Sequence, residues 1–81
     1  MAIRRTTNPR FQNPRYRSLI DRLANERRRQ NITQEVLAAR LGTHKQFVSR
    51  VELGERRLDV VEFVDFARAL GLDANVLVAS L

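Results

Sequence analysis

Apolar residues recur at every third or fourth position through most of this chain, the spacing that places them on one face of an α-helix. In residues 14–30 this stripe consists of Leu19, Ile20, Leu23 and Ala24. The same spacing returns in later segments that are separated by short loops. The pattern predicts an all-α fold, a compact bundle of five helices with no strand. The first expected helix starts at residue 14 or 16 and ends at residue 30, and the third starts at residue 44 or 45 and ends at residue 53. The other three expected helices cover residues 34–41, 59–70 and 74–81.

Capping residues set the expected helix boundaries. Thr33 is a good N-cap, and Asp59 with Glu62 three positions later is typical of a capping box. Gly42 supplies the positive φ that a helix end commonly needs, and Asn31 is expected to stop the first helix in the left-handed conformation.

The expected core draws on every helix. Leu77 in the last helix should complete it. The fourth helix is expected to bury five apolar side chains, Val60, Phe63, Phe66, Ala67 and Leu70.

Most of the net charge of +6 lies in the first 17 residues, which hold five arginines and no acidic residue. We predict a flexible, basic N-terminal arm over residues 1–15 and a single domain over residues 16–81. Such an arm favours a polyanionic partner, although a merely solubilising tail has the same composition. The arm residues expected to contact a polyanion are Arg4, Arg5, Arg10 and Arg15.

The sequence lacks residues that several classes of function require. Cysteine is absent, which excludes disulfides and thiolate metal sites, and a single histidine, His44, does not make a zinc site. We expect no metal, no cofactor and no enzyme activity, because no nucleophile arrangement or phosphate loop is visible. The sequence shows no secretory signal or membrane span, so the expected compartment is a bacterial cytoplasm.

Residues 33–53 predict two short helices joined by a tight turn. Ala38 is small enough for a close helix crossing, Gly42 fits the turn, and Val48 and Val51 are branched residues for the inner face. The outer face of the second helix carries a cation, an amide, a hydroxyl and a second cation, at Lys45, Gln46, Ser49 and Arg50. A short helix of this kind is suited to enter a DNA major groove and contact base edges.

Residues 18–78 resemble the Cro and Xre type of repressor domain, the lambda repressor-like helix-turn-helix family. The resemblance is carried by Thr33-Gln34, Leu37-Ala38, Leu41-Gly42, Val48-Ser49-Arg50-Val51-Glu52, Gly54, Leu58-Asp59-Val60 and Ala67-Arg68-Ala69-Leu70-Gly71. It implies base contacts by the four outward residues of the second helix of the pair. It also implies phosphate contacts by Gln34, Thr43, His44, Arg56 and Arg57, and a structural ion pair between Arg27 and Glu52.

Other interpretations of these residues stay open at this point. Gln34 is also a good early-helix residue, His44 could serve only as a cap, and Arg50 could form a surface salt bridge. Phe47 either packs under the preceding helix or touches a thymine methyl group. The basic arm either reaches around the duplex or into a minor groove, or it only adds salt-sensitive affinity.

A single domain of this size covers few base pairs, so specific binding usually needs two recognition helices about 34 Å apart. Residues 73–81 are apolar and carry no charge after Asp73. We expect a homodimer through Val76, Val78 and Leu81, with a frayed tail as the alternative.

The sequence therefore predicts a dimeric transcriptional regulator that binds an inverted repeat in double-stranded DNA. It would act as a repressor, with its own operon as a candidate target, like controller proteins of restriction systems or regulators of mobile elements. The alternative is a protein-interaction module, such as an antitoxin-like partner or an antiactivator of another regulator. An interaction module would tolerate acidic or apolar residues at the positions predicted to face DNA.

Overall fold

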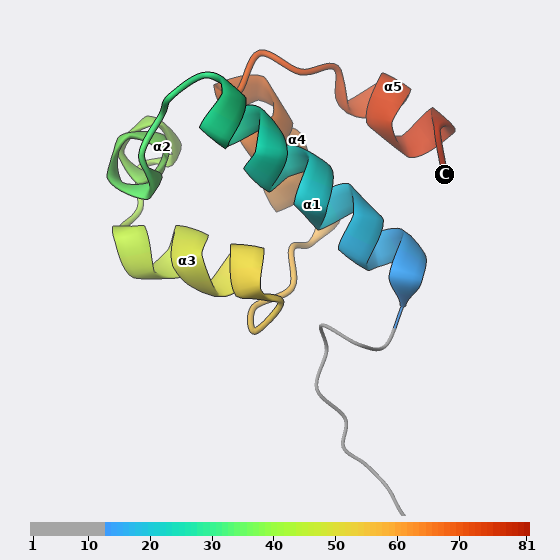
Figure 1. The fold of residues 1–81 in the computed structure, drawn as a ribbon, viewed down its shortest axis with the longest axis horizontal. Coiled ribbons are helices and arrows are strands. Elements are labelled where there is room, and N and C mark those ends of the chain that lie inside the picture. Colours follow the sequence, from blue (N-terminus) through green and yellow to red (C-terminus); the bar gives the residue numbers. More distant parts are fainter. Residues whose placement is uncertain (1–12) are drawn as a thin grey trace, which may run out of the picture.

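The computed structural model describes residues 13–81, and all regular secondary structure in this range is helical (Figure 1). The predicted all-α fold is confirmed. The helices are α1 (Pro14–Arg29), α2 (Gln34–Leu41), α3 (Lys45–Leu53), α4 (Val60–Ala69) and α5 (Ala74–Ala79).

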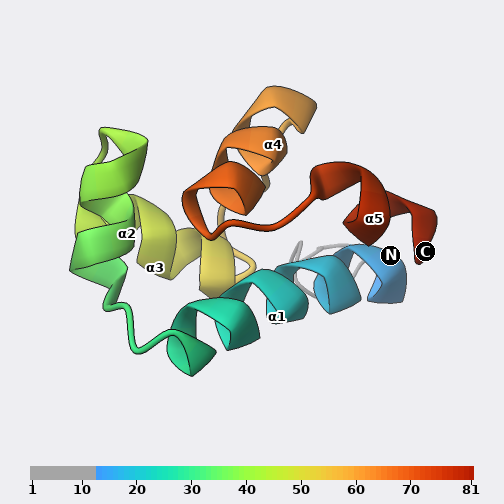
Figure 2. The same ribbon diagram turned by 90° about the horizontal axis from the view of Figure 1, so that it is seen from above.

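Helix α1 lies along one face of the domain, and the other helices lie on the same side of it (Figure 2). Helices α2 and α3 lie together at the C-terminal end of α1, whereas α5 lies beside its N-terminal half. Helix α2 packs against α3 and α4, α1 packs against α3, and α4 packs against α5. This arrangement leaves one long side of α3 free of neighbouring helices (Figure 1).

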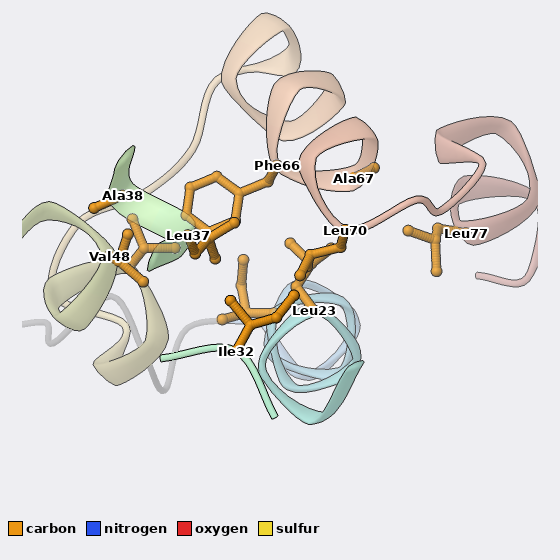
Figure 3. Packing of buried hydrophobic residues seen from close by; sticks show 11 residues of the cluster. Leu23, Ile32, Leu37, Ala38, Val48, Phe66, Ala67, Leu70 and Leu77 are labelled. Atoms are coloured by element: carbon orange, nitrogen blue, oxygen red, sulfur yellow. The ribbon is translucent and has the colours of Figure 1, made fainter. Parts of the chain in front are cut away.

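The core lies between α1, the α2–α3 pair and α4 (Figure 3). The ring of Phe66 points from α4 toward Leu37 and Val48, so the helix-turn-helix pair packs directly on α4. Leu77 reaches from α5 toward Leu70 and is buried, which confirms its predicted place in the core. Burial of a large aliphatic or aromatic side chain contributes about 1.5 to 3 kcal/mol, so these contacts dominate the stability of the bundle.

The turn between α2 and α3 is closed by two backbone hydrogen bonds. The N–H groups of Gly42 and Thr43 donate to the carbonyls of Ala39 and Ala38, at 3.1 and 2.9 Å. Gly42 has φ of 70°, a left-handed conformation that glycine adopts without steric strain because it has no Cβ atom. Asn31 adopts φ of 59° after α1, which confirms its predicted role as a left-handed stop.

The N-terminal caps were also predictable. Thr33 accepts a hydrogen bond from the Val36 N–H at the start of α2. At the start of α4, Asp59 and Glu62 form the predicted capping box, in which each side chain accepts from the backbone N–H of the other.

Three details differ from the sequence-based expectation. Val60 was expected in the core, but it is 79% exposed because it is the first residue of α4, at a helix end that extends past the core. Helix α5 ends at Ala79, two residues before the predicted end at Leu81. Asn13 caps α1 by accepting from the N–H groups of Arg15 and Tyr16, so Arg15 lies in the first turn of a helix and not in an arm.

Candidate DNA-binding site

Helix α3 has one buried side and one exposed side. Val48 and Val51 are 0% and 1% exposed, because they belong to the core cluster on the side of α3 that packs on α1 and α2. The other side carries the four residues that the sequence predicted to contact bases, Lys45, Gln46, Ser49 and Arg50. Three of them are exposed and Ser49 is half-buried. Residues 13–81 therefore leave this side of α3 accessible to a ligand.

These four side chains line one shallow surface hollow, which they share with Leu53 and Glu55. Leu53 is 49% exposed, although it is apolar. From the sequence alone, Leu53 is placed only as the last residue of its helix. Its position four residues after Ser49 and three after Arg50 is the helical spacing that would have identified it.

The start of α3 is ordered by His44. Its Nδ1 atom accepts a hydrogen bond of 3.3 Å from the N–H of Phe47, so His44 is the N-cap. The first N–H groups of a helix have no intrahelical acceptor and carry partial positive charge. The half-buried Thr43 and the exposed His44 therefore flank a helix end that favours an anion.

Glu52 joins three helices through its carboxylate. The Arg27 guanidinium donates two hydrogen bonds to it, Nε to Oε2 at 2.7 Å and Nη2 to Oε1 at 3.0 Å. The Gln34 amide donates a third, to Oε1 at 2.9 Å. Arg27 also donates to the carbonyl of Ile32 at 2.8 Å. The acidic residue of α3 thus holds α1 and the start of α2 in place.

The hydrogen bond from Gln34 to Glu52 affects the prediction that Gln34 contacts a phosphate. Its amide nitrogen is engaged by Glu52, and the residue is half-buried at the start of α2. The hydrogen bond fixes the Gln34 side chain beside α3, so its contribution within the protein is to orient α3.

The two arginines after α3 are held differently. Arg56 donates to both oxygens of the Glu62 carboxylate, at 3.0 and 2.6 Å, and its guanidinium lies 5.1 Å from the centre of the Phe47 ring. Hydrogen bonds from Arg56, and secondly from the Asp59 N–H, lower the pKa of the Glu62 carboxyl. Arg57 lies 4.8 Å from the centre of the Tyr16 ring. A phosphate would compete with Glu62 for the Arg56 guanidinium. Among residues 13–81, the guanidinium of Arg57 lies against an aromatic ring and forms no salt bridge with a carboxylate.

Phe47 packs against the core. It is half-buried, and its ring centre lies 6.0 Å from that of Phe66. The Arg56 guanidinium covers the ring. These contacts favour packing over contact with a thymine methyl group.

The residues predicted to form the dimer lie in and just after α5. Helix α5 lies beside the N-terminal half of α1, at the end opposite to the α2–α3 pair (Figure 2). Val76, Val78 and Leu81 are 60%, 53% and 48% exposed. Val78 and Leu81 line an apolar groove of about 400 Å³, whose other walls come from α1 and the start of α4. The remaining lining residues are Asn13, Arg15, Tyr16, Leu19, Ile20, Leu58, Asp59, Val60 and Phe63.

The three predicted arm residues Arg4, Arg5 and Arg10 lie outside the described residues. Residues 13–81 contain no group of three histidine or acidic side chains placed to hold a metal ion. In the same part of the chain, no helix has the length and hydropathy needed to span a bilayer.

Comparison with known proteins places this geometry in a family. The model of the helix-turn-helix family matches residues 23–77, which include the whole α2–α3 pair. An XRE-family like protein from Pseudomonas syringae pv. tomato is 50% identical over 82% of this chain and 80% of its own, with a TM-score of 0.78. None of the curated proteins matches the chain. The chain therefore belongs to the Cro/Xre-type helix-turn-helix family of DNA-binding transcription regulators.

Proposed function

We propose that this protein is a homodimeric repressor that recognises an inverted repeat in double-stranded DNA through α3. One observation carries the proposal. The polar side of α3 is accessible to solvent, while Val48 and Val51 anchor its opposite side in the core. A rigidly held helix with an accessible polar side can enter a major groove as a unit.

The side chains on α3 divide into chemical roles. The Gln46 amide suits the paired acceptor and donor of adenine, and Lys45 or Arg50 suits the two acceptors of guanine. The exposed methyl groups of Leu53 suit the methyl group of thymine. Ser49, which can donate or accept, contacts whichever base lies between them.

Phosphate contacts would set the register of the domain on the duplex. We assign them to Thr43 and His44 at the start of α3 and to Arg57 beyond its end. Gln34 and Arg56 contribute mainly by orienting α3 and the following loop, because each is already hydrogen-bonded to a carboxylate.

The apolar groove supports the homodimer. Single apolar side chains on a surface are ordinary, but an apolar groove flanked by exposed Val60, Val78 and Leu81 is suited to a self-complementary contact. A dimer that covers this groove would present two α3 helices to the duplex. It would repress by occupying promoter DNA in a bacterial cytoplasm.

The test is selection of binding sites from a pool of random duplexes by the full chain. We expect an enriched inverted repeat whose half-sites are about 10 base pairs apart, centre to centre. The matched control is the Arg50→Ala variant, which should enrich a degenerate sequence. Recovery of the same pool composition with and without protein would overturn the proposal.

A further inference from the structure

Arg17 contacts the recognition helix from a distant part of α1. Its Nη2 atom donates a hydrogen bond of 2.7 Å to the backbone carbonyl of Glu52. The same guanidinium donates from Nε and Nη2 to Oδ1 of Asp21, at 3.0 and 2.8 Å. Asp21 thereby holds the guanidinium in the orientation that reaches α3.

The Glu52 carbonyl needs a donor from outside its helix. The N–H groups of Glu55 and Arg56 are the next donors along the chain, and both point to the Arg50 carbonyl, at 2.8 and 3.2 Å. The last carbonyls of a helix also carry partial negative charge. A cation that donates to the Glu52 carbonyl therefore both satisfies it and interacts favourably with the helix dipole.

Two arginines of α1 thus converge on one residue of α3. Arg17 and Arg27 are separated by ten positions, about 15 Å along the helix axis. Arg27 binds the carboxylate of Glu52, while Arg17 binds its backbone. Val48 and Val51 anchor one side of α3 in the core, and Arg27 and Gln34 hold the Glu52 side chain. The hydrogen bond from Arg17 holds the backbone of the same residue and opposes a small rotation of the C-terminal turn of α3 about these anchors.

We propose that Arg17 is a positioning residue that fixes the orientation of α3 on α1, and thereby determines how selectively α3 reads bases. The inference rests on the proposed DNA recognition by α3. Base discrimination depends on hydrogen bonds with strict distance and angle limits, so a small rotation of the helix weakens it. Phosphate contacts by flexible cationic side chains tolerate the same rotation.

The experiment compares the full chain with Arg17→Met, which removes the donors, and Arg17→Lys, which keeps the charge but loses the fork that spans Asp21 and Glu52. Arg28→Met is the matched control. It removes one charge from an exposed side chain of the same helix whose hydrogen bond is to Asn25 within α1. Circular dichroism first fixes a temperature at which all variants are fully folded.

Binding is then measured to the DNA site selected by the full chain and to a scrambled duplex. For Arg17→Met and Arg17→Lys we expect the ratio of the two affinities to fall about three- to tenfold, with affinity for the scrambled duplex nearly unchanged in Arg17→Lys. Arg28→Met should keep the ratio. An equal loss on both duplexes would make Arg17 a simple phosphate contact and overturn the proposal, as would an unchanged ratio.

A second measurement does not depend on DNA. Residual dipolar couplings of backbone amides report the angle between α1 and α3 in the free protein. We expect this angle to change in both Arg17 variants and to stay the same in Arg28→Met. An unchanged angle overturns the inference even if DNA is bound as proposed. A changed angle in a protein that selects no DNA site would instead refute the proposed function and leave the positioning contact intact.

Discussion

The Arg27 guanidinium and the Glu52 carboxylate form a two-point ion pair in which both side chains are nearly buried, 11% and 7% exposed. The pair links α3 to α1, the longest helix in residues 13–81. A desolvated ion pair adds little net stability relative to apolar packing, but removing one partner leaves an uncompensated buried charge. The pair is therefore a point at which a small chemical change should have a large effect.

We expect Glu52→Gln to lower the free energy of unfolding by about 3 kcal/mol, because Arg27 keeps its charge and loses its counter-charge. Urea unfolding followed by circular dichroism measures the change. The control is Glu55→Gln, an exposed glutamate just beyond α3. A loss below about 1 kcal/mol would place the pair among ordinary surface salt bridges.

Replacing Gln46 with alanine should weaken binding to the selected DNA site by about 1 to 3 kcal/mol and change binding to random DNA little. The reason is that an amide–adenine contact exists only on the correct sequence. Titration of labelled duplexes by fluorescence anisotropy gives both affinities. The control Asn75→Ala removes an exposed amide from α5 and should leave both affinities unchanged. If Gln46→Ala loses equal affinity for the selected site and for random DNA, Gln46 does not read a base.

Removal of residues 1–12 should flatten the dependence of DNA affinity on salt, because Arg4, Arg5 and Arg10 would no longer release counterions. The deletion ends before Asn13, which caps α1 and should be retained. Binding measured at several salt concentrations gives the slope. A full-length variant with these three arginines changed to glutamine should reproduce it. Equal slopes for all three proteins would show that the arm does not bind phosphates.

Val78→Asp should abolish dimerisation, since it places a charge in the apolar groove that we assign to the second copy. Val78 is already 53% exposed, so the monomer should stay folded. Sedimentation equilibrium measures the oligomeric state. Val36→Asp, at a 44% exposed position of α2, is the control. If Val78→Asp remains a dimer, the partner covers another surface.

The Glu26 carboxyl should titrate with a pKa of about 2, because hydrogen bonds from Arg29, and secondly from Gln30, favour its charged form. A depressed pKa in the folded state means that the stabilisation is fully present above pH about 4.5 and is lost as the pH falls toward 2. Carboxyl carbon NMR measures the titration. Arg29→Gln should raise the pKa toward its ordinary value and Arg28→Gln should not; a titration near pH 4.5 in the unmodified protein would contradict the prediction.

Local signals made most of the fold predictable. The stops at Asn31 and Gly42 and the capping box at Asp59 depend only on neighbouring residues, and all three are present in the structure. Val60 was misplaced because helical periodicity assigns a face to each residue but not the point where the core ends.

Long-range contacts of the site were harder to predict. The Arg17–Glu52 hydrogen bond spans 35 positions and depends on how α1 packs on α3. The pairing of Arg56 with Glu62 was missed because Glu62 was already explained as a capping residue, and one carboxylate performs both tasks. The accessible side of α3 follows from its periodicity, whereas the DNA sequence that we propose it reads does not.

The separation between the two sides of α3 has an evolutionary consequence. Side chains at positions 45, 46 and 50 point away from the core, so exchanging them alters few internal contacts. If α3 reads bases as we propose, descendants of this domain can acquire new target sites through a few substitutions and keep the same scaffold. Natural selection can then change the binding preference of the domain at its exposed positions and preserve its folding through its buried ones.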